Sequence, residues 1–180
     1  KKELGKVFHP ILGITANSSI FSNSIKNKVI NNISWTNWSK ACRENYIKYS
    51  IPPKYISEPN MGKIMLTLRE RMSNKTIITI DAGNFSGWPQ RFWKYSEVKT
   101  QLAPTSGAMG YSIPAAVSAK IAKKDSHVIA FCGDGGFMMS SQELATCYQY
   151  NITPIIIIIN NKMLGTIRMH QEKHYPNRTI

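Results

Sequence analysis

The sequence predicts an α/β fold, in which a doubly wound, mostly parallel sheet carries helices on both faces. Three short apolar segments, residues 76–80, 127–132 and 154–159, have the length and the β-branched content of buried strands. Helical patterns separate these segments, and such alternation is typical of right-handed βαβ units. The last segment is apolar throughout, which favours a parallel strand covered on both faces.

Apolar spacing and end residues locate the helices between the strands. Four apolar residues at helical spacing predict a helix before the first strand: Met61, Met65, Leu68 and Met72. A second helix is expected from about residue 110 to 124, with lysines in its last turn that suit the helix dipole. A third is expected over residues 140–151, because Ser140 and Glu143 match the S-x-x-E capping box.

The chain is predicted to contain two parts, residues 1–56 and 57–180. Pro52, Pro53 and Pro59 stand close together between them, and proline pairs do not continue helices. The chain also begins without Met, so we expect it to be a piece of a longer protein.

Composition and charge disfavour several classes of protein. The formal net charge is +13, but the 23 Lys and Arg residues are scattered, which indicates a solvated basic surface and no nucleic-acid partner. The longest aliphatic run, residues 155–159, is far shorter than the ~20 residues that span a membrane. We see no secretory signal, and three cysteines cannot all pair, so a cytoplasmic location is expected.

Polar residues directly follow the second and third predicted strands, as GDGG at residues 133–136 and NN at residues 160–161. These positions are carboxyl ends of parallel strands, the edge at which open α/β sheets bind ligands. The carboxylate of Asp134 and the amide oxygen of Asn161 suit Mg²⁺. The glycines admit a bulky anion, and the amino end of the helix expected near Ser140 would favour phosphate.

Each of these two short sequences is also common in ordinary turns. Their combination is more specific, since 24 residues and one βαβ crossover separate Gly135 from Asn160. One carboxylate and one amide make a poor metal site alone but a good one when a diphosphate supplies the remaining oxygens.

GDG followed after 24 residues by NN resembles the signature of the thiamine-diphosphate-dependent enzymes. SGAMGYSIPAAVSA, at residues 106–119, is similar to the G-x-M-G-x-x-x-P-A-A segment of the acetolactate synthase-like and pyruvate decarboxylase-like branch. DAGNFSGW, at residues 81–88, is similar to the element that precedes that segment. The resemblance implies a thiamine-diphosphate-binding fold over residues 57–180, truncated at its C-terminus, after the end of a middle domain and a linker.

The resemblance also implies roles for individual residues. Asp134 and Asn161 would bind Mg²⁺ through side-chain oxygens, and Met163 through its backbone carbonyl. Met109 would wedge between the two rings of thiamine diphosphate, although a methionine is also an ordinary core residue. The other cofactor-binding residues would surround the diphosphate and the rings: Asn84, Gly107, Gly135, Gly136, Gly165 and Thr166.

Several neighbouring residues have two readings. Ile167 and His170, with Thr166, would approach the thiazolium or substrate side. His170, His174 and Arg168 are proton-transfer groups or pocket-lining and surface residues, and the second reading is favoured because no carboxylate partner is identifiable. One aromatic-rich group lines a channel or, in the favoured reading, packs in the core: Trp88, Arg91, Phe92 and Trp93.

The implied activity is decarboxylation of a 2-keto acid and transfer of the resulting acyl carbanion equivalent, as in acetolactate synthases. The implied cofactors are thiamine diphosphate and Mg²⁺, with FAD an open question. The family's catalytic glutamate lies in a separate pyrimidine-binding domain, usually on a partner subunit, which nothing in this chain matches. The resemblance therefore implies a composite site in a homodimer or homotetramer, and an inactive isolated chain.

Other activities stay open. Acetolactate synthases usually carry a Trp where this chain has TIRMH at residues 166–170. The departure leaves 2-keto acid, oxalyl-CoA or benzoylformate decarboxylase-like and glyoxylate carboligase-like chemistry as alternatives. A non-catalytic domain that kept the fold is a further alternative.

Overall fold

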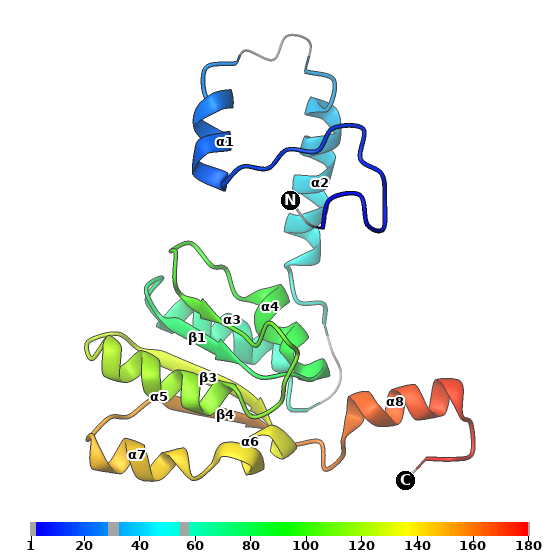
Figure 1. The fold of residues 1–180 in the computed structure, drawn as a ribbon. Coiled ribbons are helices and arrows are strands. Elements are labelled where there is room, and N and C mark those ends of the chain that lie inside the picture. Colours follow the sequence, from blue (N-terminus) through cyan, green and yellow to red (C-terminus); the bar gives the residue numbers. More distant parts are fainter. Residues whose placement is uncertain (1–2, 29–32, 55–57, 180) are drawn as a thin grey trace. The chain divides into compact units, whose positions relative to one another are not determined.

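A computed structural model of the chain describes residues 3–28, 33–54 and 58–179 (Figure 1). The chain divides into two compact units, residues 1–44 and 45–180. The boundary predicted near residue 56 lies outside the described residues. No helix within the described ranges has the length and apolar content of a membrane-spanning helix.

The first unit contains α1 (Ser18–Ile25), and α2 (Thr36–Tyr49) spans the division between the units. The side chain of Asn17 caps α1 by accepting a hydrogen bond from the backbone N–H of Ile20 at 2.9 Å. Neither α1 nor α2 has a buried residue, so neither contributes to a core.

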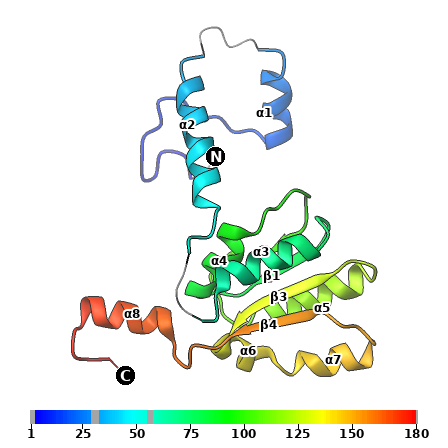
Figure 2. The same cartoon turned by 180° about the vertical axis from the view of Figure 1, so that it is seen from behind.

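The second unit is built on a parallel four-stranded sheet with the order β2-β1-β3-β4 (Figures 1 and 2). Its strands are β1 (Ile77–Ile80), β2 (Gln101–Leu102), β3 (Val128–Gly133) and β4 (Ile155–Ile159). The chain runs from β1 to β2 on one side and then returns past β1 to β3 on the other. The point between β1 and β3 where this direction reverses is the topological switch of the sheet.

Helices cover both faces of this sheet, as the sequence predicts for a doubly wound fold (Figures 1 and 2). The helices of this unit are α3 (Met61–Arg71), α4 (Gly87–Phe92), α5 (Ser112–Ala122), α6 (Asp134–Ser140), α7 (Glu143–Gln149) and α8 (Gly165–His174), with a short 3-10 turn, η1 (Asn84–Ser86). Met65 of α3 and Phe92 of α4 pack with Ile78 and Ile80 of β1 on one face. The alternate strand residues, such as Ile77, pack against α5 on the other face.

Two sequence expectations are wrong in detail. The helix expected over residues 140–151 is divided: α6 already begins at Asp134, and Ser140 ends it, with a buried hydroxyl that has no hydrogen-bond partner in the described structure. The capping box therefore does not form. β4 is not covered on both faces, because it lies at the edge of the described sheet, and Ile155 and Ile158 remain 38% and 43% exposed.

The central strand β3 provides a test of the core. Phe131→Ala is expected to lower the free energy of unfolding by about 3–5 kcal/mol, because the ring is fully buried between β1 and β4. Urea unfolding followed by circular dichroism measures the change. Val98→Ala is the control, since Val98 is 86% exposed and should shift stability by less than about 0.5 kcal/mol. Equal effects in the two variants would contradict this core.

The three free thiols differ in burial, and their reactivity should differ accordingly. Burial, together with the nearby Asp81 carboxylate, raises the pKa of the Cys132 thiol to about 11. At pH 8 only about one in a thousand of these thiols would be ionised, even before access is considered. A thiol reagent should therefore label the exposed Cys42 in the native protein and Cys132 only after unfolding, as peptide mass spectrometry would report. Rapid native labelling of Cys132 would refute this arrangement.

Candidate functional site

A pocket lies at the carboxyl ends of β1, β3 and β4, beside the topological switch. Four parts of the chain line it: residues 82–85, Met109, residues 133–136 and the segment that leaves β4. All sequence-predicted metal and cofactor residues except Gly107 belong to this lining: Asn84, Met109, Asp134, Gly135, Gly136, Asn161, Met163, Gly165 and Thr166. Gly107 is exposed and outside the pocket, with a positive φ of 67° that suits a turn.

The pairing of β3 with β4 brings the two candidate metal-binding side chains together. Gly133 pairs with Ile159, so Asp134 and Asn161 follow the ends of adjacent strands, which are about 4.8 Å apart in a sheet. The backbone N–H of Met163 donates to Asn161 Oδ1 at 3.2 Å, which folds the loop after β4 back over its own start. A carboxylate and an amide oxygen in one pocket fit the ligand preference of Mg²⁺.

The amino end of α6 supplies the anion-binding part of the pocket. The sequence placed this helix end near Ser140, but α6 begins at Asp134, so its unpaired first-turn N–H groups lie in the pocket itself. A Cβ at position 136 would overlap Asp81 Oδ2, so glycine is required there. A Cβ at position 165 would lie 2.9 Å from Asn161 Nδ2, so Gly165 lets the amide sit close to the backbone.

Two apolar side chains converge over Gly135. A Cβ added there would lie 3.2 Å from Met109 Cε and 3.3 Å from Leu164 Cδ2. Met109 is only partly buried, so it lines the pocket and is not a core residue. Sequence reasoning missed Leu164 as a lining residue, and its only signal was its place three residues after Asn161.

Sequence reasoning also missed Asp81, which is 2% exposed directly after β1. Its Oδ1 accepts hydrogen bonds from the backbone N–H groups of Ala82 at 3.0 Å and Tyr111 at 3.1 Å, and its Oδ2 accepts one from Gly110 at 3.0 Å. The signal available in the sequence was an acid directly after an apolar strand, the position that Asp134 also occupies.

The residues with two sequence readings separate clearly. Thr166 and Ile167 line the pocket, whereas His170 and His174 lie outside it, with their rings stacked 6.1 Å apart on α8. Arg168 forms an exposed ion pair with Glu172 at 2.9 Å. The surface reading therefore holds for these three residues.

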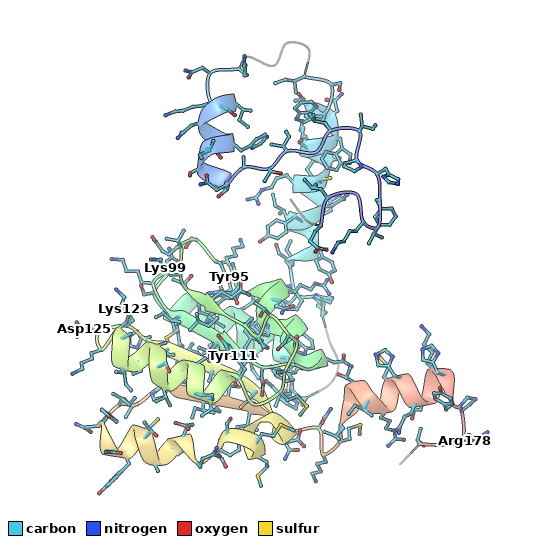
Figure 3. All side chains as sticks on the ribbon, in the orientation of Figure 1. Tyr95, Lys99, Tyr111, Lys123, Asp125 and Arg178 are labelled. Atoms are coloured by element: carbon cyan, nitrogen blue, oxygen red, sulfur yellow. The ribbon has the colours of Figure 1, made fainter. Side chains whose placement is uncertain are left out.

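The aromatic-rich group packs and does not line the pocket. Phe92 and Trp93 are buried in the core under β1. The guanidinium of Arg91 lies 3.6 Å from the ring centroid of Tyr49, and its Nε donates to the Tyr49 carbonyl at 2.7 Å. Figure 3 shows all the described side chains, with Tyr111 at one end of α5 and Lys123 and Asp125 at the other.

Comparison with known proteins follows the same boundaries. Residues 81–180 match the family model of the thiamine pyrophosphate enzyme, C-terminal TPP binding domain. The chain is 37% identical over 128 residues to a probable acetolactate synthase large subunit of Methanocaldococcus jannaschii, covering 71% of this chain and 21% of that protein. It is 30% identical over 184 residues to the acetolactate synthase large subunit of Porphyra purpurea, covering 98% of this chain and 31% of that protein.

A solved structure supports the fold. The thiamine diphosphate-dependent 4-hydroxybenzoylformate decarboxylase of Rhodococcus jostii RHA1 superposes with a TM-score of 0.64 at 25% identity, covering 71% of this chain and 25% of that one. The chain thus spans between about a fifth and a third of the length of these relatives. Because the family model covers more than half of the chain and includes all four pocket-lining parts, this chain belongs to the thiamine pyrophosphate enzymes and carries the acetolactate synthase-like form of their C-terminal cofactor-binding domain.

Proposed function

We propose that this chain is the Mg²⁺- and thiamine-diphosphate-binding part of an enzyme that decarboxylates a 2-keto acid and transfers the remaining acyl unit to a second carbonyl compound. The observation that carries this proposal is the placement of Asp134 and Asn161 at adjacent strand ends in one pocket. The curated relatives named as acetolactate synthases support this reaction over others.

The residues of the pocket divide the work by their chemistry. Asp134 and Asn161 would hold Mg²⁺ through side-chain oxygens and Met163 through its carbonyl, while the metal and the first-turn N–H groups of α6 would hold the diphosphate. Asn84 lies across the pocket, where its Nδ2 is 3.9 Å from Met169 Sδ, and would close the diphosphate side. Thiamine diphosphate supplies an electron sink for decarboxylation.

Apolar side chains would form the ring-binding half of the pocket. Met109 and Leu164 already converge over Gly135, so they offer an apolar wall that excludes water from the reacting side. Thr166 would lie at the far side of this wall, and the Gly107 carbonyl would accept a hydrogen bond from the aminopyrimidine.

The proposed site is completed by groups outside this chain. An activating glutamate would come from a pyrimidine-binding domain of the full-length protein or of a second subunit in a cytoplasmic homodimer or homotetramer, and FAD would be a question for the full-length protein. The part of the relatives that this chain does not span leaves room for such a domain. Simple decarboxylation is the second candidate, because residues 166–170 lack the expected Trp and the solved relative is named a decarboxylase.

Cofactor binding provides the direct test. Thiamine diphosphate with Mg²⁺, at about 100 times the dissociation constant, should stabilise the chain by about 2.7 kcal/mol in thermal unfolding. Asp134→Ala should abolish this gain, because it removes the charged metal ligand. Asp125→Ala is the matched control, since it removes the same charge from an exposed turn at the opposite end of α5 from Tyr111. A well-folded chain with no shift would disprove the proposed function.

Turnover provides a second test. The chain alone, with both cofactors and pyruvate, should form no acetolactate at ordinary enzymatic rates of about 1–1000 per second, because it lacks the activating glutamate. The full-length protein should form acetolactate, detected after its conversion to acetoin. Acetaldehyde as the main product would instead favour the decarboxylase, and turnover by the isolated chain would contradict a composite site.

A further inference from the structure

We propose that Asp81 is a positioning residue that fixes the loop carrying Met109 and so determines how the pocket binds the rings of thiamine diphosphate. The inference rests on the proposed function, since it assigns the ring-binding half of that pocket to this loop. Asp81 itself is 2% exposed and is absent from the pocket lining, so it acts through the backbone and not by touching a ligand.

The hydrogen bonds of Asp81 define the start of α5. Tyr111, the residue before the first turn of α5, offers that helix no side-chain cap. Asp81 comes from β1, 29 and 30 residues earlier in the chain, and accepts from the N–H groups of Gly110 and Tyr111 instead. The carboxylate thus ties the end of β1 to the loop before α5, where the positive end of the helix dipole favours a negative charge.

The same carboxylate also fits against the beginning of α6. No Cβ can be placed at position 136 without overlapping Asp81 Oδ2, so the carboxylate lies directly on this glycine. It is therefore placed at the amino ends of two helices, α5 and α6, which hold the two sides of the pocket. Its position at the topological switch explains why one group can reach both.

Met109 is held by these contacts on its C-terminal side. Gly110 follows it, with a positive φ of 84°, and a Cβ at that position would lie 3.2 Å from Met139 Cβ of α6. Gly110 is thus bound by Asp81 on one side and confined by Met139 on the other. With its backbone fixed in this way, the Met109 side chain reaches over Gly135.

The substitution Asp81→Asn separates positioning from packing. Asparagine keeps the shape that fits Gly136, but its NH₂ group cannot accept a hydrogen bond. An amide oxygen kept towards Ala82 and Tyr111 turns the NH₂ group towards the Gly110 N–H, so the loop loses its anchor next to Met109. The metal and diphosphate ligands, Asp134 among them, are unchanged.

Two ligands report on the two halves of the pocket: Mg²⁺ with thiamine diphosphate, and Mg²⁺ with inorganic diphosphate, each titrated calorimetrically into the chain. Asp81→Asn should raise the dissociation constant of thiamine diphosphate about tenfold and change that of inorganic diphosphate less than twofold. Asp134→Asn should weaken both ligands, and the exposed control Asp125→Asn neither. A loss of affinity for inorganic diphosphate as large as that for thiamine diphosphate, or no loss for either, would overturn the inference.

The wild-type chain distinguishes failure of the inference from failure of the proposed function. Binding of neither ligand by the folded wild-type chain defeats the proposed function and the inference with it, whereas binding of both without the selective loss defeats the inference alone. If circular dichroism shows that Asp81→Asn does not fold, Gly110→Ala displaces the same loop without altering the carboxylate, because its φ and Met139 both oppose a Cβ. It should reproduce the selective loss, and an equal loss for both ligands would overturn the inference.

Discussion

The parallel register of the sheet is the constraint on which the site depends. Ile80 pairs with Phe131, and Gly133 pairs with Ile159, so three strands end at one level. A polar residue follows each of these ends within two positions, and the pocket forms where they meet. A shift of β4 by one residue would move Asn161 away from Asp134 and turn the apolar side chains of β4 to the wrong face.

Glycine and acid are linked at the centre of this arrangement. The Asp81 carboxylate needs the missing side chain at position 136, and the pocket needs the open backbone that the same glycine provides. A structural requirement and a binding requirement therefore coincide at one residue, which ties the geometry of the pocket to the folding of the two helices around it.

Sequence patterns predicted the strands β1, β3 and β4 and the helices α3 and α5, because long apolar periods are local signals. They did not predict β2, which has only two residues, nor the break between α6 and α7, where a local capping motif competed with a helix that begins directly after β3. Asp134 and Asn161 were predictable because each follows an apolar run. The role of Asp81 was not, because two of its three partners lie 29 and 30 residues away.

The partly exposed edge strand has a consequence for the behaviour of the isolated chain in solution. β4 consists of five consecutive isoleucines with no charge or proline, and among the described strands only β3 pairs with it. Its outer row of backbone donors and acceptors is a template for strand addition by another copy, which charged or proline-bearing edges normally discourage. Colloidal self-association, more than loss of native structure, should thus limit the concentration at which this chain can be handled.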